Sequence, residues 1–256
     1  MATWASRRRT VYASIGLILA IGLIGVPIFL YLYETPTCAD GMMNQGEGGV
    51  DCGGPCPKLC RTSFLVPEVS WARSDKIATG VYNIAAYIVN PNVSGIARNV
   101  PYIFHVYDNA GILITEVRGT ITLPPHKNVL AFEPGIAMAK RIPARTVFEF
   151  TGAPQWETLN TPEPLVSIVN TTLTNTDSGA SLDTTLENRS LIQYKKLTVY
   201  AILYDEEGNT NGFARSYVDA LNVGEKQTIT FTWPTPREGE VTKREVVVVV
   251  GSRIGN

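Results

Sequence analysis

The chain has 256 residues and a formal net charge of -1, with 22 Lys and Arg residues against 23 Asp and Glu residues. A charge balance this close to neutral gives no support for nucleic acid as a partner. The two histidines, His105 and His126, lie far apart in the sequence, which argues against a His-based metal or catalytic site.

A run of 24 residues without a charged side chain extends from Thr10 to Tyr33. A helix rises about 1.5 Å per residue and about 20 apolar residues cross a bilayer core, so residues 10–33 are long enough to span one. A cleaved signal peptide is the alternative. Its apolar region is about 7–15 residues long and ends in a small-x-small site, whereas this run is longer and no Ala-x-Ala precedes Cys38. We therefore predict an uncleaved signal-anchor that contacts the lipid bilayer through residues 10–33.

Three arginines, Arg7, Arg8 and Arg9, stand directly before the run, and no basic residue follows it closely. Basic residues near a membrane span favour the cytoplasmic side. Residues 1–9 are therefore predicted to form a cytoplasmic tail, and residues 34–256 are predicted to lie outside the cell membrane.

The four cysteines of the chain, Cys38, Cys52, Cys56 and Cys60, all lie within 23 residues. The surrounding Gly- and Pro-rich segment has few large apolar residues, and disulfides usually hold such extracytoplasmic pieces together. Two bridges with three possible pairings are expected, so residues 34–61 are predicted to form a Cys-rich stalk. A zinc site of four thiolates is an alternative, although the intervals of 13, 3 and 3 residues lack its usual two short Cys pairs.

Oxygen-bearing side chains recur in the same Gly-rich segment, at Asp40, Asn44, Glu47 and Asp51. Calcium takes carboxylate and amide oxygens as ligands, but the spacing is not that of an EF-hand loop. Two interpretations stay open. The segment is either a plain disulfide-held spacer without a cofactor, or a calcium site made of these four residues.

A dense pattern, C-x-D-G-x-x-N-x-G-E-x-x-x-D-C-G-G-x-C, extends from Cys38 to Cys56. It resembles a short motif of bacterial surface and secreted proteins. The resemblance implies an envelope or cell-surface setting and does not imply an enzyme.

Short alternating apolar runs separated by turn residues recur from residue 62 onward, which is typical of β-sandwiches. We predict a mainly β protein with two tandem immunoglobulin-like β-sandwich domains, residues 62–153 and 165–256, joined by a Pro-containing linker, residues 154–164. The expected strands are Ala78–Val89, Ala97–Tyr107, Ile112–Val117, Arg118–Leu123, Asn128–Phe132, Thr146–Phe150, Leu165–Thr174, Ser181–Glu187, Leu197–Tyr204, Phe213–Ala220, Gln227–Trp233 and Val241–Val250.

The two predicted β domains match each other as an internal repeat of about 95–100 residues. In each, an Asn is followed 17 or 18 residues later by the Asp of a Tyr-Asp-x-x-Gly turn. The two copies are Asn90 with Tyr107–Gly111, and Asn188 with Tyr204–Gly208. Each Asp is expected to accept backbone N–H bonds across a turn that the Gly closes.

The repeat resembles the FxLYD-type immunoglobulin-like domains of bacterial envelope proteins. The second copy fits that pattern through Leu203–Gly208 (LYDEEG) and Val218–Glu225 (VDALNVGE). The first copy has the Tyr107-Asp108 pair but lacks the Gly-Glu turn, since Pro124-Pro125-His126-Lys127 stands there. The resemblance implies a fold and no site residues.

The C-terminal run Glu245–Val250 (EVVVVV) is strongly β-forming and apolar. It is expected to be the buried final strand of the second sandwich. The alternative is an exposed edge that pairs with another chain.

No sequence motif of a named reaction is present: there is no G-x-S-x-G, no H-E-x-x-H and no phosphate-binding loop. We predict an extracytoplasmic binding or structural protein of the cell envelope without catalytic activity, whose partner is an unknown envelope protein or surface ligand. The alternative is an accessory subunit of a membrane-embedded enzyme, secretion or pilus-type complex. In that case Gly16, Gly22 and Gly25 of the helix, and a strand edge, would make the contacts.

Overall fold

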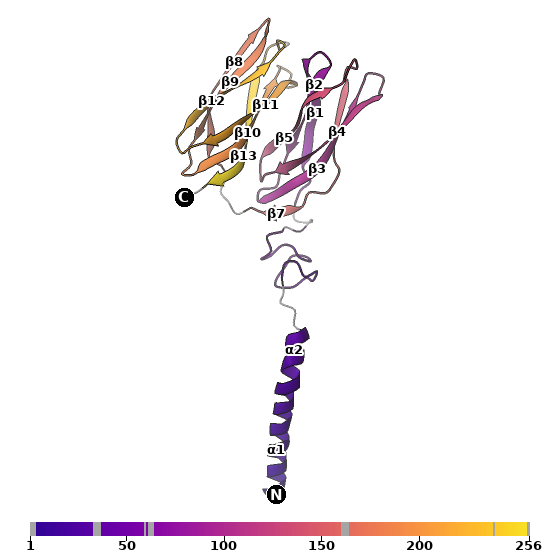
Figure 1. Cartoon of the computed structure of the whole chain (residues 1–256), viewed down its shortest axis with the longest axis vertical. Coiled ribbons are helices and arrows are strands. Elements are labelled where there is room, and N and C mark those ends of the chain that lie inside the picture. The colour runs from indigo at the N-terminus through magenta and orange to yellow at the C-terminus, as the bar shows by residue number, and fades with distance from the viewer. Residues whose placement is uncertain are drawn as a thin grey trace. The chain divides into compact units, whose positions relative to one another are not determined.

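The computed structural model describes residues 4–32, 37–58, 60, 64–159, 164–237 and 239–254. The chain forms two compact units, Met1–Cys56 and Pro57–Asn256 (Figure 1). The first unit contains the N-terminal helix and most of the Cys-rich segment, and the second contains the β-strands. The predicted mainly β fold with one N-terminal apolar helix is confirmed.

The helix comprises α1 (Trp4–Ala20), a π-helical turn η1 (Ile21–Gly25) and α2 (Val26–Leu32). Residues Arg7–Ile28 have the length and composition of a membrane span or a signal sequence, and their side chains are exposed. Pro27 gives a reason for the π turn, because its nitrogen has no hydrogen and its ring crowds the carbonyl group one turn earlier. Tyr33, the predicted last residue of the span, lies outside the described residues.

Two antiparallel sheets form the first sandwich. One has the strand order β1-β2-β5, and the other has the order β4-β3-β6, with β7 also paired to β3. The strands are β1 (Glu68–Ala78), β2 (Val81–Val89), β3 (Gly95–Tyr107), β4 (Leu113–Leu123), β5 (Asn128–Ala137), β6 (Arg145–Phe150) and β7 (Trp156–Thr158). Alternate residues of both sheets meet in a core that includes Ile84, Phe104, Leu123 and Trp156.

Two further antiparallel sheets form the second sandwich, with the strand orders β12-β9-β8 and β11-β10-β13. The strands are β8 (Val166–Thr176), β9 (Gly179–Asn188), β10 (Gln193–Tyr204), β11 (Thr210–Leu221), β12 (Lys226–Trp233) and β13 (Lys243–Ile254). Their core includes Leu182, Leu197, Leu203 and Phe231.

The Tyr-Asp-x-x-Gly turns make the hydrogen bonds expected from the sequence. Asp108 Oδ1 accepts from the amides of Ala110 and Ile112, at 3.0 and 2.9 Å. Asp205 Oδ1 accepts in the same way from the residues two and four positions later, at 3.0 and 2.8 Å. The glycine of each turn, Gly111 or Gly208, has φ of 75° or 79°, a conformation that glycine adopts without strain.

Two strands were not predicted. β1 carries Arg73, Asp75 and Lys76, so its apolar alternation is weak. β7 lies in the stretch predicted as a linker, yet Trp156 is 1% exposed in the first core and β7 pairs with β3. In addition, the residues predicted as two short strands between Ile112 and Leu123 form the single strand β4.

The sheets β1-β2-β5 and β11-β10-β13 are covered on both faces. One face of each lies in the core of its own sandwich, and the opposite faces pack on each other in a third apolar cluster, which we call the inter-sandwich layer. Its buried members are Ala85, Tyr87, Leu130, Phe132, Ile202, Tyr204 and Phe213. The two sandwiches therefore form a stack of four sheets, with β5 beside β10 and β13 in Figure 1.

This stack gives the reason for the run of valines in β13. Val246, Val248 and Val250 pack against the core of the second sandwich, whereas Val247 packs against the inter-sandwich layer and Val249 against the core of the first. Strands buried on both faces read as continuous apolar runs rather than alternating ones. The valines of this final strand are thus half-buried on both faces rather than fully buried, and β13 is an edge strand of its sheet.

Candidate functional sites

Disulfides hold the Cys-rich segment, as the sequence predicts. Cys38 is bonded to Cys56, with 5.6 Å between their Cα atoms. Cys52 and Cys60 are also disulfide-bonded, so no cysteine among the described residues is free. The segment has no apolar core of ordinary size, yet Cys56 is only 4% exposed. The disulfide sulfurs therefore take the place of an apolar core in this segment.

The predicted calcium ligands bind parts of their own segment. Asp40 accepts hydrogen bonds from the amides of Thr37 and Met42, both at 2.9 Å, and from Asn44 Nδ2 at 3.0 Å. These bonds, led by that of Asn44, hold the pKa of Asp40 below its usual value. Asp51 accepts from the amide of Gly41 at 3.0 and 3.1 Å. Backbone amides of the loop thus point toward the carboxylates of the two aspartates.

Glu47 is the buried member of the four, with 5% of its surface exposed. Its Oε2 accepts from the amides of Asn44 and Asp51, at 3.3 and 3.2 Å. Asn44 Oδ1 is buried, and none of the described residues donates a hydrogen bond to it. A buried amide oxygen in this situation favours a cation, and calcium at these four residues stays a prediction.

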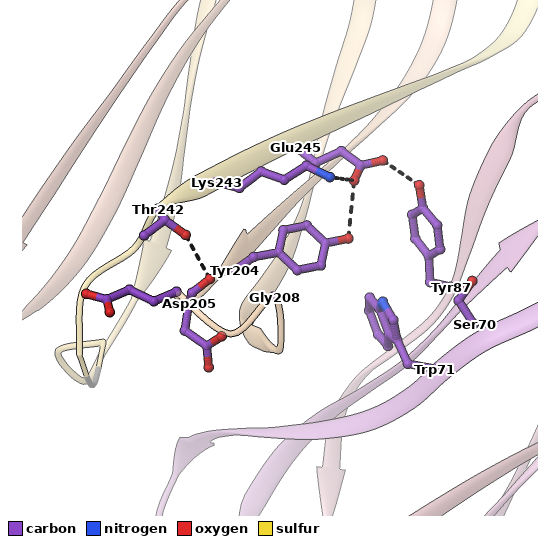
Figure 2. A pocket seen from close by; sticks show the side chains of 10 residues that line it. Ser70, Trp71, Tyr87, Tyr204, Asp205, Gly208, Thr242, Lys243 and Glu245 are labelled. Atoms are coloured by element: carbon purple, nitrogen blue, oxygen red, sulfur yellow. Dashed lines mark hydrogen bonds and ion pairs between the residues drawn. The ribbon is translucent and has the colours of Figure 1, made fainter.

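A second candidate site, which the sequence did not indicate, lies where the two sandwiches meet. A cavity of about 430 Å³ opens there. It is lined by Trp71 and Tyr87 of the first sandwich and by Tyr204, Lys243 and Glu245 of the second (Figure 2). Trp71 stacks on Tyr87, with 5.8 Å between ring centroids. Cavities at domain boundaries are frequent ligand sites.

Glu245 is the polar centre of this cavity (Figure 2). One of its oxygens accepts a hydrogen bond from the Tyr87 hydroxyl, and the other accepts from the Tyr204 hydroxyl at 3.2 Å. Lys243 Nζ lies 3.7 Å from the same carboxylate and 4.9 Å from the centroid of the Tyr204 ring. Burial, and then the charge of Glu245, raise the pKa of Tyr204 to about 12. The polar groups of the cavity therefore satisfy one another.

An ion pair joins the sandwiches at a second point. Arg237 Nη1 lies 3.0 Å from Asp75 Oδ1, and the two side chains are 5% and 15% exposed. The guanidinium also donates to the carbonyl oxygen of Asn211 at 3.1 Å and to Thr235 Oγ1 at 2.6 Å. Burial raises the pKa of Asp75 above its usual value, and the charge of Arg237 opposes that rise. The pair fixes one sandwich against the other.

The histidines take ordinary positions. His105 lies on β3 with Nδ1 3.1 Å from Glu116 Oε1 on the neighbouring β4. His126 lies in the turn before β5 with φ of 48°, and its amide donates to the carbonyl oxygen of Asn92 at 2.7 Å. Both contacts are of the kind that holds strands and turns in place.

Sequence signals for the inter-sandwich site exist but are easily overlooked. Runs such as Ile84–Ile88 and Val129–Phe132 are apolar at consecutive positions rather than alternate ones, as expected of strands covered on both faces. The ion pair has no local signal, because Asp75 and Arg237 are 162 positions apart.

No family model and no curated protein matches the sequence. Among solved structures, red sea bream transglutaminase is similar at 11% identity with a TM-score of 0.24, over 72% of this chain and 30% of that one. A Bacteroides uniformis β-glucuronidase is similar at 12% identity with a TM-score of 0.24, over 68% of this chain and 25% of that one. A putative β-galactosidase from Bacteroides fragilis is similar at 13% identity with a TM-score of 0.21, over 69% of this chain and 33% of that one. The chain thus spans about a quarter to a third of these proteins, and likeness at this level says nothing of function.

Proposed function

We propose that this protein is a single-pass, membrane-anchored binding or structural protein of the cell envelope without catalytic activity. The observation that carries the proposal is the helix from Thr10 onward, which has no charged residue up to Leu32 and exposes its apolar side chains as far as Ile28. Such a helix is not stable in water and needs lipid as its surroundings. The sheets and their cores would then act outside the membrane.

The orientation follows from charge and redox chemistry. Arg7, Arg8 and Arg9 favour a cytoplasmic N-terminus, and the disulfides require an oxidising compartment. Both arguments lead to the same side for residues 34–256. The resemblance to surface-protein motifs and to FxLYD-type repeats adds support, since the turns at Asp108 and Asp205 make equivalent hydrogen bonds.

Topology can be tested on intact cells or spheroplasts that carry an N-terminal tag and a C-terminal tag. Added protease should remove the C-terminal tag and the β domains while the N-terminal tag survives. Sequencing the N-terminus of the mature protein separates an anchor from a cleaved signal peptide. A mature protein that begins after residue 33, or β domains that resist protease until the membrane is lysed, would contradict the proposal.

A second candidate function, an accessory subunit of a membrane complex, is favoured by strand β8. Its sequence, VSIVNTTLTNT, contains no charged residue, and among the described strands β8 pairs only with β9. The other edge strands that the structure describes each carry at least one charged residue. Charged residues protect sheet edges from pairing, so β8 is the edge most open to an added strand.

Co-purification in mild detergent tests this second function. Thr172→Lys with Thr174→Lys places two charges on the exposed side of β8 and should release a partner that is bound there. Thr232→Lys on β12, the opposite edge of the same sheet, is the matched control. If both variants retain the partner equally, β8 is not the contact.

The calcium prediction needs its own measurement. Calcium at Asp40, Asn44, Glu47 and Asp51 should raise the melting temperature of the oxidised protein, and a chelator should reverse the rise. An unchanged melting temperature over millimolar calcium leaves the segment as a disulfide-held spacer.

A further inference from the structure

The cavity between the two sandwiches carries more negative than positive charge. Its volume of about 430 Å³ lies within the range of small-molecule sites, about 300–1,000 Å³. Three carboxylates line it, those of Asp205, Glu206 and Glu245, against one ammonium group, that of Lys243. A cleft lined mostly by one sign of charge concentrates ions of the opposite sign. The cavity therefore favours a cationic ligand over an anionic one.

Lys243 shows how the cavity holds a cation (Figure 2). Its Nζ lies 3.7 Å from Glu245 Oε2 and 4.9 Å from the centroid of the Tyr204 ring. The first distance exceeds the length of an N–H···O hydrogen bond, about 2.7–3.2 Å. A cation within about 6 Å of an aromatic centroid is attracted by the ring. The negative charge and the ring therefore hold this ammonium group without an N–H bond to Glu245.

Lys243 can leave this position at little cost. It is the first residue of β13, and its side chain is 67% exposed. Ion pairs of exposed lysines contribute little to stability, because water screens the charges and the long side chain loses freedom when it is held in place. When its stem turns into the solvent, the Tyr204 ring and Glu245 are open to a cation from outside.

The other polar groups of the cavity restrict the kind of cation. The two oxygens of Glu245 already accept hydrogen bonds from the hydroxyls of Tyr87 and Tyr204. A ligand with many hydrogen-bond donors, such as a sugar, would have to break these bonds. A methylated ammonium group has no N–H to satisfy, and its methyl groups pack against aromatic rings. This group thus fits the cavity without disturbing its hydrogen bonds.

We propose that the cavity binds a methylated ammonium group in exchange for the Lys243 ammonium. Tyr204 presents its ring to the methyl groups, and Glu245 supplies the opposite charge. Trp71, which lines the same cavity and stacks on Tyr87, adds aromatic surface to the wall. The inference rests on the proposed binding function, to which it adds a class of ligand.

The test uses the full chain in a polyoxyethylene detergent, which carries neither a sugar nor an ammonium group. Equilibrium dialysis against radiolabelled choline measures the binding. The binding should saturate at one choline per chain, and tetramethylammonium should compete with it. Two other molecules should not compete. They are maltose and the neutral analogue of choline in which a carbon atom replaces the nitrogen.

Lys243→Met removes the competing ammonium group and keeps an apolar side chain. It should tighten choline binding by about 2–30-fold, which corresponds to the energy of one cation–π contact. Lys226→Met is the matched control. Lys226 also pairs with a glutamate, at 3.5 Å, and its side chain is 58% exposed, but it lies on β12 outside the cavity. This control should bind choline as tightly as the unmutated chain.

Tyr204→Leu removes the ring that faces the ligand. It should weaken choline binding by about 2–30-fold for the same reason. The comparison of Lys243→Met with Lys226→Met holds even if Tyr204→Leu fails to fold, because both lysines are exposed.

Three results would overturn the proposal. The first is the absence of saturable choline binding by both the unmutated chain and Lys243→Met. The second is competition by maltose or by the neutral analogue that is as strong as that of tetramethylammonium. The third is a Lys243→Met variant that binds choline no more tightly than Lys226→Met. Binding in detergent does not depend on the side of the membrane that the domains occupy, so a failure here is distinguishable from a failure in the topology assay.

Discussion

Replacement of Arg237 by Met probes the contact between the sandwiches most directly. The change keeps an unbranched apolar stem but removes the cation that faces Asp75, whose side chain is 15% exposed. Removing one partner of a buried ion pair typically costs about 3–5 kcal/mol, because the other charge stays buried without compensation. We expect a loss of that order in the free energy of unfolding at neutral pH.

The loss should depend on pH, with a sign that the structure fixes. Burial already raises the pKa of Asp75, and without Arg237 the pKa rises further. A carboxyl group whose folded pKa exceeds its unfolded pKa takes up a proton more readily in the folded state. Stability therefore falls as pH rises through the folded pKa. The penalty of Arg237→Met should be largest at neutral pH and should shrink toward pH 4–5. The total change in the penalty is about 1.4 kcal/mol for each unit by which the Asp75 pKa of the folded variant exceeds that of the folded unmutated protein.

Chemical denaturation of a soluble fragment, residues 37–256, provides the assay, with Trp71 near the contact as a fluorescent reporter. The fragment keeps all four cysteines. A double variant, Arg237→Met with Asp75→Asn, should recover most of the loss because no charge is then left buried. A penalty that is constant between pH 4 and 8, or a double variant as unstable as the sum of the single ones, would refute the reasoning.

Three further changes test other contacts. Glu245→Gln should lower the pKa of Tyr204 from about 12, while burial keeps it above its usual value, as read from phenolate absorbance; an unchanged titration would contradict the assigned role of Glu245. Gly119→Ala places a Cβ 2.5 Å from the buried hydroxyl of Tyr102 and should cost about 1–3 kcal/mol in denaturation; no loss would mean that the hydroxyl moves freely. Val247→Asp buries a carboxylate against the inter-sandwich layer and should destabilise the fragment by about 2 kcal/mol or more.

The matched control for the last change is Val223→Asp, since Val223 is 54% exposed. A surface substitution of this kind usually changes stability by about 0.5 kcal/mol or less. Equal losses for the two aspartates would show that β13 is not buried on its outer face.

Local sequence determined the elements that depend on near neighbours. The uncharged run from Thr10 predicts the apolar helix, because helix length and side-chain polarity are set residue by residue. The Tyr-Asp-x-x-Gly turns have their Asp and Gly within a few positions of each other, so Asp108 and Asp205 were placed correctly. The even number of clustered cysteines likewise predicted two disulfides, although not which cysteines pair.

The sequence pattern did not predict the strands β1 and β7, and each omission has an identifiable reason. β1 contains charged residues that weaken its apolar alternation, and one of them, Asp75, pairs with Arg237 across the contact instead of facing water. β7 has only three residues, too few for any periodicity to be detected.

The tertiary structure alone decided how the sandwiches meet and which side chains are buried inside the Cys-rich segment. Tyr87 donates to Glu245 across 158 positions, and Asp75 pairs with Arg237 across 162. Contacts of this range depend on which sheet faces pack together, and side-chain periodicity does not specify that choice. Glu47 reads as one polar residue among many in a Gly-rich loop, and only folding buries it against the Cys38–Cys56 bond. The sequence thus determined the helix, most strands and the turns, while the packing of strands far apart in the chain determined the sites.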